Sequence, residues 1–265
     1  MNIRFIPLIA VLLLGFSSML LAFSVLSTES QAADTQVSVY KASADPMQDV
    51  QLALEQAKKN DKLALIILGA QWCHDSMGLA DKFDAPEMQV ILADNFETAF
   101  VDVGYLEDRR DITQRFGQAN YFATPTVLIV DPHSERLLNA DSLQKWGVAD
   151  SIPVSQYIEY FSGFGHSDVD PLPPLSELNS RQIKQFELQQ AERLMQAYRL
   201  LRTDLRADVE RTPDQTPNED FYKRWAEVRS FRLQLQADIQ ALYSKAREQH
   251  DAGLSLPTYP KFSWE

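Results

Sequence analysis

One uninterrupted apolar run, Leu63 to Leu68, leads almost directly into the only cysteine of the chain. A short run without polar alternation is typical of a strand buried on both faces. The segment that follows, Trp72-Cys73-His74-Asp75-Ser76, is expected to form the turn into a helix that begins at about Ser76. A thiol in that position meets the free N–H groups and the positive end of the helix, and both favour its thiolate form.

Further apolar runs predict a sheet around this strand. Ala99 to Val103 and Thr126 to Val130 have the same pattern, and Asp131-Pro132-His133-Ser134 predicts a turn into a short return strand, Arg136 to Leu138. Because helices alternate with the strands and the last pair forms a hairpin, we expect a mixed α/β sheet covered by helices on both faces. The other elements predicted in this half are a strand over 36–40 and helices over 46–59, 76–83, 86–95, 108–116 and 155–161.

The second half of the chain has a helical pattern. Asp170-Pro171-Leu172-Pro173-Pro174 blocks both helix and sheet, so it predicts a semi-rigid linker. Apolar residues then recur at steps of three and four on both sides of a break at 211–220, which predicts two amphipathic helices in an antiparallel hairpin. Two helices alone make a thin core. Their apolar stripes, which include Phe221, Trp225 and Phe231, therefore need a further surface, either the first half of the chain or another subunit.

The N-terminus has the pattern of an export signal. Arg4 is followed by the apolar stretch Phe5 to Leu26, and Ser30-Gln31-Ala32 provides a small-residue site after which cleavage is expected. The stretch is also long enough to span a bilayer, so an uncleaved anchor over residues 5–26 is the alternative. We therefore divide the chain into a signal peptide (1–32), a first domain (33–168), a linker (169–176), a helical hairpin (177–250) and a tail (251–265).

Composition and charge narrow the function classes. The chain is 45% hydrophobic and 23% charged, which argues against a disordered chain and a polytopic membrane protein. Its net charge is −12 and it has no basic cluster, so nucleic acid is not an expected partner. A lone cysteine is free or pairs with another molecule. The adjacent residues Cys73, His74 and Asp75 cannot easily converge on one tetrahedral ion, and no phosphate-binding glycine motif is present, so neither a metal nor a cofactor is expected.

Residues 45–162 resemble the thioredoxin-like superfamily at two places. One is the strand–turn–helix with Trp72-Cys73-His74-Asp75-Ser76, and the other is Ala123-Thr124-Pro125-Thr126. Gly69-Ala70-Gln71-Trp72-Cys73 looks like the exported bacterial branch, so the resemblance implies a periplasmic location. It also implies a thioredoxin-like mixed sheet with helices on both faces, followed here by the antiparallel helical hairpin. In this family the proline of such a Thr-Pro is cis, packs beside the sulfur and exposes the preceding backbone to an incoming peptide.

The chain departs from the family pattern at two positions. Ser76 replaces the resolving cysteine, and Ile67 stands where many thioredoxins have a buried acid. Both departures argue against dithiol reductase activity. The expected catalytic residues are Cys73 as the nucleophile, His74 as a charge that stabilises the thiolate when protonated, and Ser76 as a hydrogen-bond donor to the sulfur.

Substrate binding is expected at Trp72, Thr124 and Pro125, and three functions fit this set of residues. The first is thiol–disulfide exchange with a single cysteine, suited to isomerisation or deglutathionylation. The second is a non-catalytic adaptor that binds an extended segment at the Pro125 groove and docks a partner or a second copy through the hairpin. The third is a redox sensor that oxidises at Cys73. The expected partners are protein disulfides or thiols, with glutathione, the membrane and a homodimer through the hairpin as further candidates.

Overall fold

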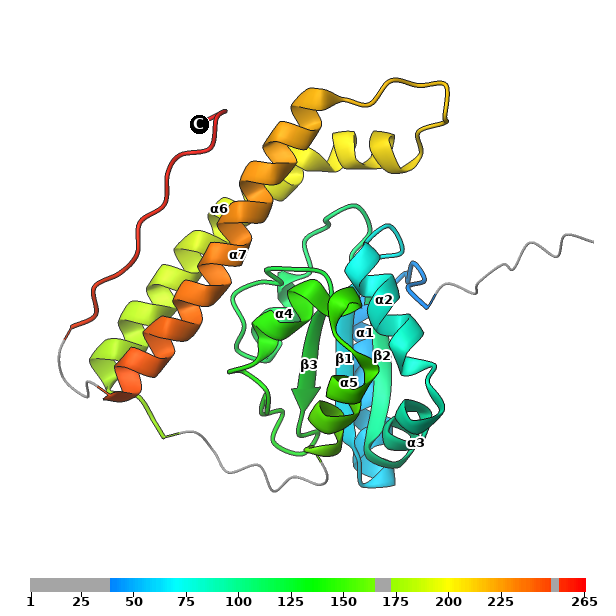
Figure 1. Ribbon diagram of the computed structural model, residues 1–265. Coiled ribbons are helices and arrows are strands. Elements are labelled where there is room, and N and C mark those ends of the chain that lie inside the picture. Colours follow the sequence, from blue (N-terminus) through cyan, green and yellow to red (C-terminus); the bar gives the residue numbers. More distant parts are fainter. Residues whose placement is uncertain (1–38, 165–172, 249–252) are drawn as a thin grey trace, which may run out of the picture. The chain divides into compact units, whose positions relative to one another are not determined.

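Strand β1 (Leu63–Gly69) lies at the centre of the sheet, and all of its residues are buried. In the computed structural model, which describes residues 39–164, 173–248 and 253–265, β1 pairs in parallel with β2 (Phe96–Asp102). On its other side it pairs antiparallel with β3 (Thr126–Val130), so the strand order is β2-β1-β3 (Figure 1). The sheet is therefore mixed, as expected, but through β3 itself rather than through a later hairpin.

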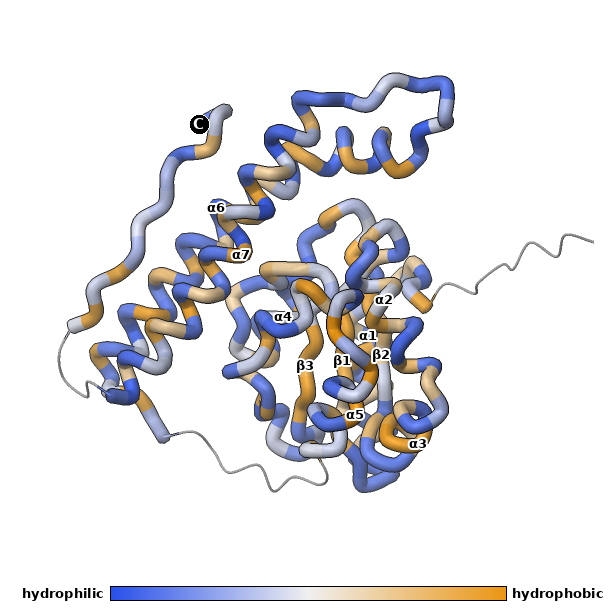
Figure 2. The backbone as a smooth tube through the Cα atoms, viewed as in Figure 1, coloured by the Kyte–Doolittle hydropathy of each residue, from blue (hydrophilic) through white to orange (hydrophobic). Residues whose placement is uncertain are grey.

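Alternate residues of β1 enter two separate hydrophobic clusters, one on each face of the sheet. The even-numbered residues from Ala64 to Leu68 join a cluster with α1 (Pro46–Asn60) and α4 (Arg110–Arg115). The odd-numbered residues from Leu63 to Ile67 join a second cluster. Its helical partners are α2 (His74–Phe83), α3 (Pro86–Asn95), η1 (Leu143–Ser151, a 3₁₀ segment) and α5 (Val154–Ser162). Figure 2 shows the corresponding hydrophobic colour along β1 and β3.

Several element boundaries differ from the sequence-based expectation. Helix α2 begins at His74 rather than at Ser76, and α4 is shorter than the expected 108–116 because it starts only at Arg110. Strand β2 begins at Phe96, three residues before the expected start. Of the strand expected over 36–40, residues 39 and 40 form a bend, and the rest lies outside the described residues.

The segment predicted as a return strand over 136–138 does turn back antiparallel to β3, but it does not form a full strand. Leu137 makes only an isolated bridge with Val130. The reason is Asn139, which is buried and bonds the backbone of β3 with its side chain: its Oδ1 accepts from Ile129 N at 2.9 Å, and its Nδ2 donates to the Val127 carbonyl at 2.9 Å. The amide side chain thus takes two of the bonds to β3, while two backbone bonds of the hairpin remain: Leu138 N donates to the Ile129 carbonyl at 2.8 Å and Asp131 N to the Arg136 carbonyl at 3.0 Å.

Two long helices follow the first half, as the apolar periodicity predicted. Helix α6 (Glu177–Val209) and α7 (Glu219–Glu248) run antiparallel and pack along each other (Figure 1). The Ser176 hydroxyl caps α6 by accepting from Asn179 N at 3.2 Å. Both helices belong to the same compact unit as the sheet, Ser38–Glu265. No helix among the described residues is long and apolar enough to cross a membrane, and the predicted signal or anchor segment lies outside them.

Candidate functional site

Cys73 lies at the junction between β1 and α2. It is the N-cap residue of α2, with extended backbone angles of φ −89° and ψ 117°. Its N–H donates to the Ala70 carbonyl at 3.1 Å, and its carbonyl accepts from Met77 N at 3.0 Å. Because α2 begins at His74, the sulfur is attached directly at the positive end of the helix. The buried strand ends at Gly69, where the Tyr40 ring approaches too closely to admit a Cβ atom, so the position requires glycine.

The Cys73 sulfur makes two contacts with Thr124. The Thr124 hydroxyl donates to Sγ at 3.2 Å, and Sγ lies 3.2 Å from the Thr124 carbonyl oxygen. The hydroxyl contact suits either ionisation state of the sulfur, whereas the carbonyl contact suits only the thiol, which can donate a proton to it. The Thr124–Pro125 peptide bond is cis. The structure thus brings together Cys73 and Thr124, which are distant in the sequence, beside Pro125.

Ser76 lies on the same turn but does not approach the sulfur as a donor. It is fully buried, and its hydroxyl oxygen accepts from Ala70 N at 3.3 Å. Its carbonyl lies 3.4 Å from the Tyr40 hydroxyl, whose pKa is raised by burial and, to a lesser degree, by the charge of Cys73. The contacts of Ser76 therefore hold the turn between β1 and α2, and the hydrogen bond to sulfur comes from Thr124.

His74 is directed to a different partner. Its side chain is 83% exposed, and its Nδ1 lies 3.5 Å from Asp150 Oδ2. The neighbouring Asp75 accepts from Asp150 N at 3.1 Å, so both residues connect the first turn of α2 to η1. Helix α2 also packs tightly against η1 at Gly78, where an added Cβ atom would stand 2.4 Å from the Asp150 carboxylate. The observed contacts of His74 are thus electrostatic and structural, and they lie on the η1 side of the helix.

Trp72 links the cysteine turn to the helical hairpin. Its indole Nε1 donates to the Gly104 carbonyl at 2.7 Å. Its ring meets the Trp225 ring of α7 edge-on, with centroids 6.0 Å apart at 78°. Arg232, also on α7, lies over the same Trp225 ring at 5.6 Å. The position expected to bind substrate is therefore packed against the hairpin of its own chain.

Helix α6 contacts the segment that precedes Pro125. The Tyr198 hydroxyl donates to the Phe122 carbonyl at 3.2 Å, and its ring packs at 5.6 Å against Tyr121. Burial raises the pKa of Tyr198, and the nearby Arg232 guanidinium offsets part of that rise. Only 9% of Cys73 is exposed.

Sequence reasoning missed Tyr198 and Arg232, because an amphipathic stripe does not reveal which surface will cover it.

The apolar residues of the hairpin are largely covered within the chain. Phe221 and Phe231 are buried, and Trp225 packs against the cluster that holds the even-numbered side of β1. This packing favours the alternative in which the first half of the chain, rather than another subunit, covers the apolar stripes of the hairpin. The described residues contain no group of three or more His, Cys, Asp or Glu side chains arranged to hold a metal ion.

Residues 45–132, which include Cys73 and Pro125, match a family model described as thioredoxin-like, in agreement with the fold of this part of the chain. A solved disulphide isomerase from Xylella fastidiosa Temecula1 has 22% sequence identity to the chain, with a TM-score of 0.43. That likeness covers 47% of this chain and 94% of the isomerase chain. No curated protein matches the sequence. Helices α6 and α7 lie outside the family match.

Proposed function

We propose that the protein carries out thiol–disulfide exchange through a single sulfur, that of Cys73. The observation that supports this most strongly is the position of Sγ, which lies at the N-terminus of α2 and 3.2 Å from the Thr124 hydroxyl beside Pro125. The helix end and a hydroxyl donor both stabilise a developing thiolate, which is the attacking species. Ser76 offers no second sulfur, so an internal disulfide cannot form.

The exchange has two balanced steps. The Cys73 thiolate attacks one sulfur of a substrate disulfide, forming a mixed disulfide and releasing the other substrate sulfur as a thiolate. A second thiol, either on the substrate or on a small molecule such as glutathione, then attacks the mixed disulfide and returns the Cys73 thiolate. One disulfide is consumed and one is formed, so isomerisation needs no outside oxidant or reductant, whereas deglutathionylation uses a second glutathione as the reductant and releases glutathione disulfide. Protein disulfides undergoing isomerisation, and proteins carrying glutathione, are the substrate classes that fit this scheme.

The proposed setting is the periplasm. Residues 1–32 have the pattern of a cleaved leader, and an anchor over 5–26 is the alternative. An exported compartment supplies the disulfides that the reaction requires. N-terminal sequencing of the protein recovered from the periplasm would give Ala33 as the first residue for a cleaved leader.

The function is tested with a scrambled disulfide-bonded protein and reduced glutathione. We expect the wild-type protein to accelerate recovery of the native disulfides and Cys73→Ala to be inactive. Cys73→Ser serves as a second variant of closer size, and both must have the circular dichroism spectrum of the wild type. Equal rates for wild type and the two variants would refute exchange at this sulfur.

The second candidate is a non-catalytic adaptor, favoured by the low exposure of Cys73 and the cover that Trp225 provides over Trp72. In this function the segment before Pro125 binds an extended peptide, and the sulfur is structural. A reporter disulfide distinguishes the two, because an adaptor leaves it intact, whereas an exchange protein forms a mixed disulfide with it. A homodimer through the hairpin belongs to this candidate and is tested by the molecular mass in solution.

A further inference from the structure

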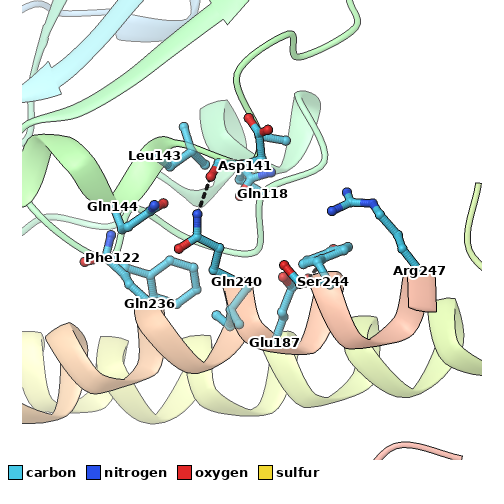
Figure 3. A pocket seen from close by; sticks show the side chains of 13 residues that line it. Gln118, Phe122, Asp141, Leu143, Gln144, Glu187, Gln236, Gln240, Ser244 and Arg247 are labelled. Carbon is cyan, nitrogen blue, oxygen red and sulfur yellow. Dashed lines mark hydrogen bonds between the residues drawn. The ribbon is translucent and has the colours of Figure 1, made fainter. Parts of the chain in front are cut away.

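A cavity lies away from the cysteine, between the segment 118–144 and the helices α6 and α7. Its volume is about 280 Å³, close to the lower end of known small-ligand pockets. None of Trp72, Cys73, Thr124 or Pro125 lines it. Figure 3 shows Glu187 reaching into this space from α6 and Arg247 reaching into it from α7. The cavity is therefore a candidate binding site distinct from the proposed reaction centre.

Glu187 carries a carboxyl group that is almost completely withdrawn from water. Only 6% of the residue is exposed, and its one observed hydrogen bond is from the Tyr243 hydroxyl, at a long 3.4 Å. Burial raises the pKa of this carboxyl to about 7. In the part of the chain that the structure describes, no Lys, Arg or His forms an ion pair with it. A buried carboxylate in this state gains from any cation placed beside it.

Arg247 provides the opposite charge in the same cavity. Its guanidinium lies over the Tyr243 ring at 5.8 Å, so Tyr243 is in contact with both charged groups. The Arg247 Nε is buried and has no hydrogen-bond partner among the described residues. A carboxylate is the group that best satisfies a guanidinium, because it can accept two parallel hydrogen bonds. The cavity thus presents a carboxyl and a guanidinium that do not neutralise each other.

The remaining residues that line the cavity provide both polar and apolar surface. The amide Oε1 of Gln236 is buried and has no donor among the described residues. Phe122, Leu143 and Ile239 provide apolar surface on the same cavity. A suitable ligand therefore carries a carboxylate, a hydrogen-bond donor with positive charge, and a small apolar body.

We propose that this cavity binds a small zwitterion of the amino-acid or dipeptide class. The ligand's carboxylate pairs with Arg247 and its ammonium group with the Glu187 carboxylate, while its apolar side chain contacts Phe122, Leu143 and Ile239. Binding gives the buried Glu187 carboxyl a cation within ion-pair distance and the buried Nε–H of Arg247 an acceptor, neither of which the described residues provide, and this is the physical source of affinity. The site does not depend on the chemistry of Cys73.

A ligand panel on the unmodified full-length protein tests the proposal. L-leucine and glycyl-L-leucine carry both charges at two different spacings, N-acetyl-L-leucine lacks the ammonium group, and L-leucinamide lacks the carboxylate. We expect at least one zwitterion to bind in isothermal titration calorimetry and to raise Tm with concentration. Both single-charge compounds should bind at least about tenfold more weakly. No binding by either zwitterion up to about 50 mM, or equal binding by all four compounds, would overturn the proposal.

Matched variants then test which side chain of the cavity recognises each charge of the ligand. Arg247→Met should abolish the preference for a free carboxylate, so that L-leucine and L-leucinamide bind alike. Glu187→Gln should likewise abolish the preference for a free ammonium group. Arg181→Met removes an exposed arginine on α6 and should change nothing, and Cys73→Ala should bind as the wild type does. Wild-type affinity in both cavity variants contradicts the proposal, and the ligand panel decides if either variant fails to fold.

Discussion

The Trp72 indole ring, next to the cysteine, packs edge-on against the Trp225 ring of α7 at a centroid distance of 6.0 Å. This contact joins the thioredoxin-like domain to a helix outside the family match. Tyr198 of α6 makes a second connection through the Phe122 carbonyl, close to Pro125. The hairpin thus contacts both segments expected to bind substrate, and we expect access to the sulfur to depend on how firmly the hairpin is packed.

Trp225→Ala should make Cys73 more reactive. Truncating a half-buried indole costs about 2 kcal/mol. A loss of that size increases the population with an opened hairpin by roughly tenfold or more, if opening exposes the sulfur. The rate of reaction with a bulky chromogenic disulfide measures this. Trp264→Ala is the control, because Trp264 stacks on Phe262 in the C-terminal tail. Equal rate increases in the two variants would mean general loosening rather than specific cover by Trp225.

Thr124→Val should slow the exchange, because it removes the hydroxyl that donates to Cys73 Sγ and keeps the shape of the side chain. A hydrogen bond to a charged group contributes about 1.5–3 kcal/mol, so the second-order rate should fall by roughly tenfold or more. Thr124→Ser retains the hydroxyl and should retain most of the rate. The measurement is the rate of mixed-disulfide formation at fixed pH. If Val and Ser variants react equally fast, the hydroxyl has no role in activating the sulfur.

The sequence predicts the buried strands well and the contacts between distant parts poorly. The run Leu63 to Leu68 is predicted correctly, because a short run of apolar residues without alternation is typical of a strand buried on both faces. The return strand is limited to one bridge, because the side chain of Asn139 takes two of the hydrogen bonds to the β3 backbone, and apolar periodicity does not reveal such a contact. The juxtaposition of Cys73 and Thr124 followed from the family resemblance. The roles of Tyr198, Arg232 and Glu187 depend on tertiary packing, which single-sequence patterns do not encode.

Ser76→Cys should convert the site into one that stores a disulfide. Cys73 is the N-cap of α2 and Ser76 is its third helical residue, and side chains at these two positions face each other at a helix start. The variant loses the hydroxyl that accepts from Ala70 N, which costs about 1 kcal/mol. After mild oxidation, thiol titration should find no free thiol in the variant and one in the wild type. Two free thiols under the same conditions would show that the sulfurs cannot approach each other.

Glu187 should make the protein less stable as the pH rises from about 4.5 to 7. The carboxyl has a pKa of about 7 when folded, against an ordinary value of 4.5, so the folded state holds the proton through this window and the unfolded state does not. The free energy of unfolding therefore falls by about 3 kcal/mol as the pH increases through this window. Above the window Glu187 causes no further change. Tyr243 and Lys184 are the neighbouring groups that act on this carboxyl: the hydrogen bond from Tyr243 and the charge of Lys184 both lower its pKa and so offset part of the rise that burial causes.

The measurement for Glu187 is urea unfolding of the wild type and Glu187→Gln at pH 5 and at pH 8. Glutamine resembles the protonated carboxyl at both pH values, so its variant should lose less stability between them than the wild type does. The difference between the two proteins in their loss of stability separates the effect of Glu187 from that of every other titrating group in the chain. Glu177→Gln, at an exposed position on the same helix, is the matched control and should follow the wild type. If Glu187→Gln loses as much stability as the wild type, the buried carboxyl is not the source of the pH dependence.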